Sequence, residues 1–367
     1  MRLNFCKITV ERFRNLSDVF FSPSPGVNVI WGDNAQGKTN FLEALWLFTG
    51  AKSFRGAKEA EMVPFGAESA SVSSQYEGGG RVHEASYRFG ADKGQKKILL
   101  NGVSHGAFSG LAGSFYAAVF SPAHLTLVKG GPPERRRFID LAICQLKPRY
   151  HAVLSQYGRL LYQRNCLMRD ARLSSVLLDT LEIWEGSLAK SAALITRTRK
   201  SYLERLGEFA GEIYSGISSG RETLSIAYHG TADGEDEEAF RRAFRASRAQ
   251  DLKTGSTSVG PHRDDAEFAI NGLLARAYAS QGQQRSIVLS LKLAECAVIE
   301  ETAGESPVVL LDDVMSELDR ERRDYLLNRL GGRQIFITCC EPDAVAAAEN
   351  GTALRIEGGR AAGLRAL

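Results

Sequence analysis

The sequence has no long hydrophobic run. It contains no stretch of about eighteen apolar residues, the length that a membrane-spanning helix requires, so we expect no transmembrane helix and no membrane partner. Residues 1–8 already alternate between apolar and polar side chains as a β-strand does, which leaves no room for a signal peptide. Together these two features predict a cytoplasmic protein.

Metal-binding and disulfide patterns are also missing. None of the cysteines is spaced as C-x-x-C, so we expect reduced thiols rather than a zinc site or a disulfide framework. The six cysteines are Cys6, Cys144, Cys166, Cys296, Cys339 and Cys340. An excess of one charge is missing too, because 46 Lys and Arg residues oppose 43 Asp and Glu residues and leave a net charge of only +3. Any contact with nucleic acid must therefore come from local basic surfaces.

What the sequence does have is an α/β pattern interrupted by a helical segment. Short β-like runs separated by turns fill the first part of the chain, helical periodicity dominates residues 134–209 and 237–252, and 223–228 could form an edge strand. The apolar runs at 308–311 and 334–338 are typical of strands buried on both faces of a parallel sheet. We predict one nucleotide-binding body made of the segments at the two chain ends, with a mostly helical insertion between them; the predicted segments are 1–133, 134–254 and 255–367.

A phosphate-binding loop follows the apolar run at 27–31. The segment matches G-x-x-x-x-G-K-[ST], and a helix is expected directly after it, which is the strand–loop–helix setting that this loop needs. Glycines let successive N–H groups point at phosphate oxygens, and the helix start adds its positive dipole end. Lys38 is expected to reach the β- and γ-phosphates, and Thr39 to hold Mg²⁺. The residues predicted to bind ATP here are Gly32, Asp33, Asn34, Ala35, Gln36, Gly37, Lys38, Thr39 and Asn40.

A second, acidic motif lies far along the chain. The run Val308–Leu311 ends in Asp312 and Asp313, and a carboxylate at the carboxyl end of a parallel strand is placed to hold Mg²⁺. We predict that role for Asp312, and we predict that Asp313 orients or deprotonates the attacking water, with Lys38 as the third catalytic residue. Apolar strands often end in Asp, so the motif is weak alone and gains weight from the loop at 32–39. The long separation of the two motifs indicates a nucleotide-binding head with an inserted arm.

A further anion site is predicted at residues 280–283. Ser280 and Gly282 precede an expected helix, and a helix start offers free N–H groups, a hydroxyl and a positive dipole end. An ordinary serine N-cap would give the same pattern. Because the chain already has a complete phosphate loop, a second anion site makes sense if it serves the nucleotide of another subunit. Gln283 is included in this predicted site.

These motifs resemble those of ABC-type ATPases. Residues 32–39, 280–283, 310–313 and 316–319 match, in order, the Walker A, signature, Walker B and D-loop motifs. More narrowly, the chain resembles the RecF family, which is related to SMC and Rad50 heads. This likeness covers essentially the full length, and three further runs carry it: Leu127–Pro132 with Arg135–Asp140, Val259–Asp265, and Ser280–Arg285.

The RecF resemblance implies an ABC-type ATPase head, a P-loop NTPase fold, with an inserted and mostly helical second lobe. It also implies an ATP-dependent homodimer on DNA, slow ATP hydrolysis that works as a switch, and help to RecO and RecR in loading RecA at single-strand gaps. Asp313 stands where transporter-type ABC ATPases carry Glu, and a shorter carboxylate reaches the water less well, which fits a slow enzyme. In related heads the region of Arg14 and Asn15 approaches the nucleotide, so both are expected at the site.

Several basic residues are candidates for contact with gapped, single-stranded or double-stranded DNA. They are Lys52, Arg55, Arg135, Arg241, Arg245 and Arg248. The last three recur at helical spacing and would line one face that could bind phosphates. Most charged helix faces are simply solvated, however, and Arg135 could instead pair with Asp140 or bind the nucleotide.

Two other functions remain open on the sequence alone. One is an ATPase subunit of an ABC transporter that is coupled to a membrane partner, although the long helical insertion argues against it. The other is a P-loop kinase for a small molecule, for which residues 280–283 would be incidental and dimerisation unnecessary. DNA-stimulated ATPase activity separates the DNA-binding function from the transporter, and phosphoryl transfer to a metabolite would identify the kinase.

Overall fold

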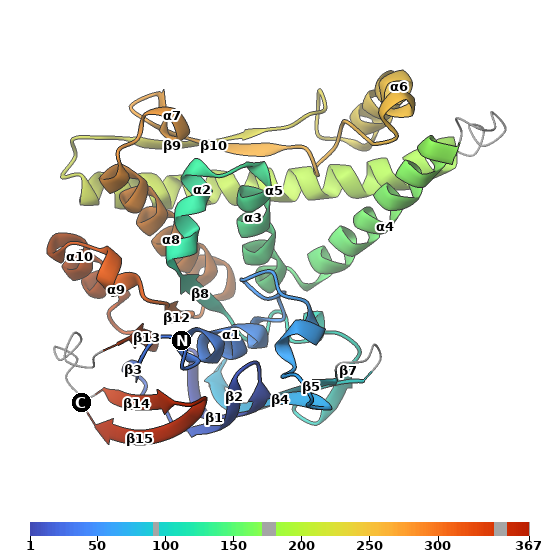
Figure 1. Ribbon diagram of the computed structural model, residues 1–367. Helices are drawn as coiled ribbons and strands as arrows, with labels where there is room; N and C mark the ends of the chain where they lie inside the picture. The colour runs from blue at the N-terminus through green and yellow to red at the C-terminus, as the bar shows by residue number, and fades with distance from the viewer. Residues whose placement is uncertain (91–94, 171–180, 341–350, 367) are drawn as a thin grey trace.

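The computed structural model describes residues 1–90, 95–170, 181–340 and 351–366 of the chain. Figure 1 shows two parts: a lower body that contains the two larger sheets, and an upper lobe of long helices beside a smaller sheet. The first and the last strands both lie in the lower body. The helical lobe is therefore inserted between the two ends of one nucleotide-binding body, as predicted from the sequence.

Six described strands form the central sheet of the body: β3 (Val27–Trp31), β8 (Ala117–Phe120), β12 (Val308–Leu311), β13 (Ile335–Cys339), β14 (Thr352–Glu357) and β15 (Arg360–Ala366). Their order is β15-β14-β3-β13-β12-β8, and all neighbours are parallel except β14 and β15. Both β12 and β13 are buried along their whole length, which confirms the two strands predicted from apolar runs. The strand β13 lies between β3, which leads into the phosphate loop, and β12, which ends in the acidic pair.

A second, antiparallel sheet completes the body, in the order β2-β1-β4-β5-β6-β7. Its strands are β1 (Asn4–Phe13), β2 (Leu16–Phe21), β4 (Ser69–Gly78), β5 (Arg81–Gly90), β6 (Lys96–Leu100) and β7 (Val103–His105). The ring of Phe5 in β1 lies 4.4 Å from that of Phe115 and 6.0 Å from that of Phe336 in β13, measured between centroids. This buried aromatic cluster joins the two sheets into one core.

The body also contains short helices next to the nucleotide motifs. These are α1 (Lys38–Trp46), α9 (Val314–Glu317) and α10 (Arg320–Leu330). Single turns of 3₁₀ helix lie at Leu47–Thr49, Glu59–Met62, Phe108–Gly110 and Pro122–Leu125. The helix predicted directly after the phosphate loop is therefore α1, whose last six residues are all buried.

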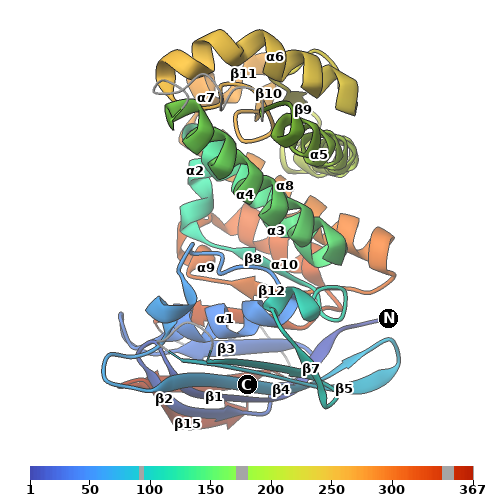
Figure 2. The same ribbon diagram turned by 90° about the vertical axis from the view of Figure 1, so that its right-hand side faces the viewer.

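The remaining described helices build the lobe and connect it to the body. They are α2 (Thr126–Lys129), α3 (Pro132–Leu146), α4 (Pro148–Asp170), α5 (Leu181–Ile217), α6 (Glu237–Thr254), α7 (Ala275–Tyr278) and α8 (Gln281–Ala303). The 37-residue α5 packs against α4, α6 and α8, and Figure 2 shows α6 lying across the top of the lobe. No described helix has both the length and the apolarity to cross a membrane.

A three-stranded sheet lies in the lobe, in the order β11-β10-β9. The strands are β9 (Leu224–His229), β10 (Asp265–Ile270) and β11 (Leu273–Leu274), so the edge strand predicted at 223–228 is confirmed. Because β10 pairs with β9, residues 265–274 belong with the lobe in space. The predicted boundary at residue 254 between the lobe and the C-terminal part of the body stays a prediction. The pairing of β10 with β9 favours a boundary further along the chain, where α8 begins.

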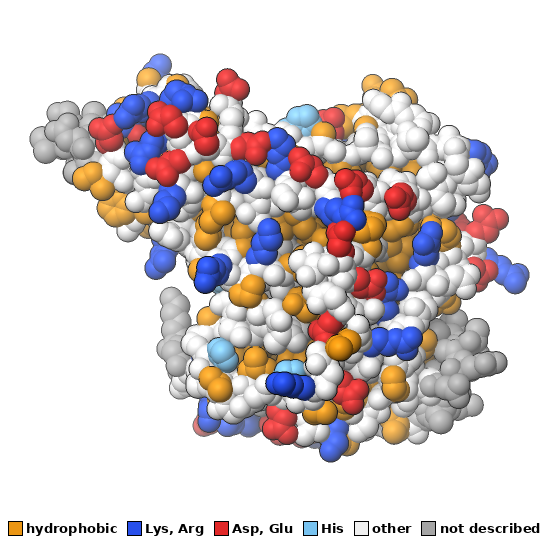
Figure 3. Space-filling view, turned by 180° about the vertical axis from the view of Figure 1, so that it is seen from behind, with side chains coloured by type: hydrophobic (Ala, Val, Ile, Leu, Met, Phe, Trp, Pro, Cys, Tyr) orange, Lys and Arg blue, Asp and Glu red, His pale blue; other side chains and the backbone are white. Residues whose placement is uncertain are grey.

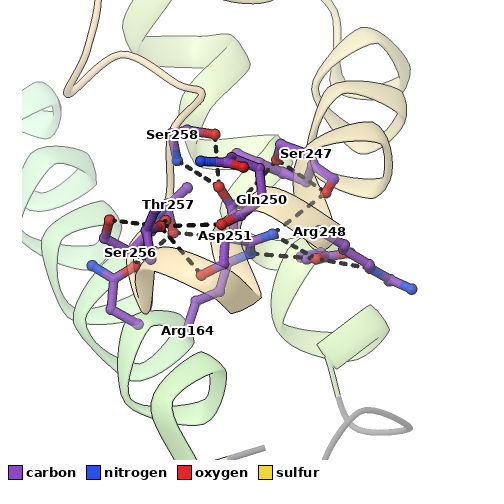
Figure 4. Close-up of polar contacts among 12 residues, drawn as sticks. Arg164, Ser247, Arg248, Gln250, Asp251, Ser256, Thr257 and Ser258 are labelled. Carbon is purple, nitrogen blue, oxygen red and sulfur yellow. Dashed lines mark hydrogen bonds and ion pairs between the residues drawn. The ribbon is translucent and has the colours of Figure 1, made fainter. Parts of the chain in front are cut away.

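A buried polar network fixes the far end of the lobe. The guanidinium of Arg164 in α4 is fully buried and donates to Asp251 of α6 at 2.8 Å, to Glu185 of α5 at 3.0 Å and to Thr257 at 2.8 Å. Asp251 is also fully buried and accepts bonds from the N–H and hydroxyl of Ser258. Figure 4 shows Arg164 of α4 meeting Asp251 of α6 and the loop residues Thr257 and Ser258. The network ties α4, α5 and α6 together through charge pairing rather than through apolar packing alone.

Candidate nucleotide-binding site

The phosphate loop has the backbone that its glycines predict. Gly32 has φ 146° and Gly37 has φ 114°, a region that residues with a side chain rarely adopt. A Cβ atom on Gly32 would lie 2.2 Å from the carbonyl oxygen of Ile356, and one on Gly37 would lie 2.6 Å from the side chain of Leu16. Since the loop joins β3 directly to α1, the predicted strand–loop–helix arrangement is confirmed.

Lys38 lies back over this loop. Its ammonium group donates to the carbonyl oxygens of Gly32 at 2.6 Å and Asp33 at 2.9 Å, and it lies 3.9 Å from the sulfur of Cys340. The positive charge is therefore held at the mouth of the loop, beside the first N–H groups of α1. An anionic group entering the loop meets the ammonium, the loop N–H groups and the helix dipole together.

The loop and the acidic motif meet as predicted. The hydroxyl of Thr39 donates to a carboxylate oxygen of Asp312 at 2.7 Å, although the two residues are far apart in the sequence. Burial raises the pKa of Asp312, and hydrogen bonds from the Thr39 and Thr338 hydroxyls oppose that rise. A hydroxyl and a carboxylate side by side are the hard oxygen donors that Mg²⁺ prefers, so these two residues fit the predicted metal role.

Thr338 is a site residue that the sequence did not reveal. It lies in β13, between the strands of the two motifs, and its hydroxyl donates to Asp312 at 3.1 Å. The same hydroxyl accepts a bond from the backbone N–H of Asp313 at 2.8 Å. The only available signal was a hydroxyl residue near the end of the second apolar run, which carries no function by itself. Thr338 thus holds both acidic residues in place.

Asp313 is exposed and has a left-handed backbone with φ 54°. The hydroxyl of Ser316 donates to its carbonyl at 2.8 Å and to its carboxylate at 3.2 Å. Because the residue is exposed, a water molecule can reach its carboxylate. Its predicted role in hydrolysis stays a prediction.

Arg14 and Asn15 lie on the turn between β1 and β2, next to the loop. The amide of Asn15 donates to the carbonyl of Ala35 at 2.9 Å and accepts from the amide of Asn40 at 2.7 Å. Arg14 forms a bidentate ion pair with the buried Glu43 of α1, at 2.5 and 2.9 Å. The structure thus brings both residues to the phosphate loop, Asn15 directly and Arg14 through α1.

The predicted signature residues begin α8. The hydroxyl of Ser280 accepts from the N–H of Gln283 at 3.2 Å, and the Gln283 side chain accepts from the N–H of Ser280 at 2.8 Å. This capping box confirms the helix start, and it is also what an ordinary serine N-cap looks like. The helix start opens on a hollow of about 500 Å³ lined by Tyr214, Ile217, Ser218, Arg221, Glu222, Ser280, Gly282, Gln283, Ser286 and Arg322.

A different hollow lies beside Thr39 and Asp312, and it shares no lining residue with the hollow at Ser280. Figure 1 shows α8 beginning beside the lobe, while α1 lies within the body. One copy of the chain therefore presents the phosphate loop and the signature residues on separate surfaces.

Arg135 does not behave as predicted for a DNA-binding residue. Only 3% of it is exposed, and its guanidinium donates to both carboxylate oxygens of Asp265 at 2.8 Å and to the carbonyl of Gly130 at 2.8 Å. The alternative partner Asp140 pairs with Arg199 instead. This burial argues against the predicted DNA contact, because the charged group is fully used in joining α3 to β10.

Three of the four arginines of α6 are paired with carboxylates, and they are the three that were candidates for DNA contact. Arg241 pairs with Glu237 and Arg245 with Glu182, and Arg248 lies 2.5 Å from Glu185. Each carboxylate offsets positive charge that would otherwise attract a phosphate. The helix is therefore less basic than its sequence indicates. Their contact with DNA stays a prediction.

Lys52 and Arg55 are exposed on the loop after α1. Arg55 donates to the amide oxygen of Asn40 at 2.7 Å and lines the hollow beside Thr39 and Asp312. Arg55 therefore lies next to the nucleotide motifs, and its predicted contact with DNA stays a prediction. Lys52 lines a separate hollow between the body and the lobe.

Comparison with known proteins gives one consistent family. Residues 5–360 match the model described as the RecF/RecN/SMC N terminal domain. The chain is 39% identical over 365 residues to the DNA replication and repair protein RecF of Acetivibrio thermocellus, covering 96% of this chain and 98% of that protein. It is 40% identical over 332 residues to RecF of Agathobacter rectalis, covering 90% and 91% of the two chains.

Solved structures that resemble this one indicate the same family. A structure described as the recombination mediator protein RecF-ATPrS in the RecFOR pathway superposes with a TM-score of 0.91 at 36% identity, over 100% of this chain and 98% of the other. An SMC head domain of Pyrococcus furiosus superposes with a TM-score of 0.55 at 15% identity and shares the fold alone. The predicted ABC-type ATPase head with an inserted helical lobe is therefore confirmed, and the chain belongs to the RecF family of DNA replication and repair proteins.

Proposed function

We propose that this chain is a recombination mediator of DNA replication and repair that binds ATP and closes as a homodimer on DNA. The names of its relatives and the ATP-bound form of a solved RecF support the repair function and the nucleotide. The observation that supports a dimer is the separation of the two predicted anion sites within one chain. Thr39 meets Asp312 within one chain, whereas Ser280 opens on another hollow. A second copy can supply the missing side of the pocket.

In this proposal the loop N–H groups and Lys38 bind the phosphates of ATP, with Thr39 and Asp312 as the residues that would hold Mg²⁺. When bound, Mg²⁺ would neutralise phosphate charge. Ser280 and Gly282 of the partner copy close over the γ-phosphate. ATP then favours the closed dimer because it binds that state better than it binds separated chains.

Hydrolysis would act as the release step. Asp313 lies beside the buried acid and faces solvent, so it is placed to orient or deprotonate a water molecule. Its side chain is one methylene shorter than Glu and is also held by Ser316, which favours slow hydrolysis. We propose slow, DNA-dependent ATP hydrolysis at single-strand gaps, cooperation with RecO and RecR in loading RecA, and a cytoplasmic location.

The partner role of Ser280 gives a direct test. Ser280→Arg places a bulky cation at the start of α8 and should prevent ATP-dependent dimerisation while leaving ATP bound to the monomer. Light scattering of the wild type and the variant with ATP and Mg²⁺ measures the difference, and equilibrium binding of ATP checks the loop. Ser104→Arg, at an exposed position of β7 away from this hollow, is the control and should dimerise normally. Equal dimerisation of the wild type with and without ATP would contradict the mechanism.

Asp313→Asn tests the release step. Removal of the carboxylate should lower the ATPase rate by about 100-fold or more, the usual contribution of a general base, without weakening ATP binding. The ATP-bound dimer should therefore live longer, which dilution followed by time-resolved light scattering can measure. Asp324→Asn, at an exposed position of α10, serves as the control. An unchanged hydrolysis rate in Asp313→Asn would remove this residue from the mechanism.

A further inference from the structure

One face of α4 carries an uninterrupted polar and basic stripe. Residues four, eight, eleven and eighteen positions after His151 fall on the same side of an α-helix. All of them except the half-buried His151 are exposed. The stripe consists of His151, Ser155, Arg159, Tyr162 and Arg169.

The positive charge on the exposed face of this helix is not neutralised. Asp170 is its single acidic residue. Among the residues that the structure describes, neither Arg159 nor Arg169 forms an ion pair with a carboxylate, and the same holds for Arg149 at the start of the helix. In α6, by contrast, Arg241, Arg245 and Arg248 are paired with carboxylates, and among the described residues only Arg242 of that helix has no such partner. The helix α4 therefore carries more unpaired arginines than α6.

The stripe leads into a hollow between the lobe and the body. The hollow measures about 560 Å³ and is lined by His151 and Ser155 of the stripe together with Lys52, Arg136 and Arg137. Arg136 donates to the carbonyl of Asp264, and Arg137 donates to the carbonyls of Ser53 and Phe54, so both guanidiniums are positioned by backbone oxygens rather than by carboxylates.

The acid that lines the hollow does not offset these cations. Asp140 is already held by the two nitrogens of Arg199, each at 2.8 Å. Burial, followed by the neighbouring Lys52 and Lys96, lowers the pKa of His151, which leaves a neutral ring that can still donate a hydrogen bond. The hollow is therefore a positively charged recess with donors and no free carboxylate among its lining residues.

Seen from behind, the lobe overhangs the body on one side, and Lys and Arg side chains lie near the gap between them (Figure 3). Because His151 and Ser155 belong both to the stripe and to the lining of the hollow, a phosphate at the hollow and a phosphate along α4 can belong to one continuous chain.

We propose that the sugar–phosphate backbone of DNA lies along the stripe of α4 and places phosphates in the hollow formed by Lys52, Arg136 and Arg137. This inference rests on the proposed DNA-binding function and gives it a surface that differs from α6. Charge complementarity supports this proposal, because a row of Lys and Arg side chains without carboxylate partners is complementary to the regularly spaced negative charges of a nucleic-acid backbone. Tyr162, 68% exposed among the cations, offers a face on which an unpaired base can stack.

The test removes two positive charges from α4 and, in a second variant, two from α6, and it compares the DNA affinity of the two variants. Arg159→Gln/Arg169→Gln should weaken DNA binding by about tenfold per arginine at 0.1 M salt and lower the slope of log affinity against log salt by about two. Arg241→Gln/Arg245→Gln removes two arginines of the same lobe that are paired with Glu237 and Glu182, and it should leave the slope unchanged. Fluorescence anisotropy with a gapped duplex, in ATP and over a salt series, measures both.

The outcomes separate this inference from the function on which it rests. A wild type that binds no DNA in any nucleotide state would contradict the proposed function. A wild type that binds DNA while the α4 variant keeps its affinity and salt slope would overturn the α4 surface alone, and a loss confined to the α6 variant would move the surface there. ATP affinity and melting temperature should stay close to those of the wild type in both variants, because none of the four arginines is buried.

Discussion

Lys38→Ala is expected to lower ATP affinity by at least about 100-fold and to abolish ATP-dependent dimerisation. The ammonium lies over the phosphate loop and donates to two of its carbonyl oxygens at 2.6 and 2.9 Å. Hydrogen bonds between charged groups contribute about 1.5–3 kcal/mol each, so losing two of them costs a factor of about 100 or more. Without ATP, nothing joins the phosphate loop of one copy to Ser280 of the other.

Isothermal titration with ATP and light scattering measure the two effects of Lys38→Ala. Lys7→Ala removes the same charge from an exposed position of β1 and should bind ATP and dimerise like the wild type. The melting temperature of Lys38→Ala should stay close to that of the wild type, because the half-exposed lysine only bridges carbonyls of its own loop. Normal ATP affinity in Lys38→Ala would contradict the assignment of this loop.

The features predicted correctly from the sequence depend on short-range chemistry. The glycines at 32 and 37 need backbone angles that other residues avoid, so their spacing specifies the loop whatever surrounds it. The buried strand β12 follows from a continuous apolar run, and the start of α8 follows from a serine with a glutamine three residues later. Each of these signals lies within about ten residues, where the sequence alone determines the structure.

The features that the sequence did not reveal depend on partners that are distant along the chain. Arg135 is buried because Asp265 lies across from it in β10, and no local pattern indicates that pairing. Thr338 acts on the site only because β13 runs between the two motif strands. Arg245 and Arg248 of α6 have their charge offset by two acids of α5, Glu182 and Glu185. The sequence shows which residues are charged, whereas the tertiary structure determines which residue each of them pairs with.

Arg164→Met is expected to destabilise the lobe by about 3–5 kcal/mol, the usual cost of leaving buried carboxylates without their cation. Arg164 lies on the same helix as the exposed arginines of α4, yet it falls on the buried face with Tyr157. Its loss strands the fully buried Asp251, while Glu185 keeps a second partner in Arg248. Denaturant unfolding followed by circular dichroism measures the change, and ATP binding by the body should persist under native conditions.

A second change distinguishes stranded charge from simple loss of packing. In Arg164→Met/Asp251→Asn the amide keeps an acceptor for the Ser258 N–H but carries no charge, so the double variant should be more stable than Arg164→Met alone. Arg159→Met, on the exposed face of the same helix, should change the unfolding free energy by less than about 0.5 kcal/mol. If the double variant is no more stable than Arg164→Met, the network acts through shape and not through charge. Recovery would instead show that α4, α5 and α6 are held in register by ion pairing, which would keep the exposed stripe of α4 in a fixed position above the body.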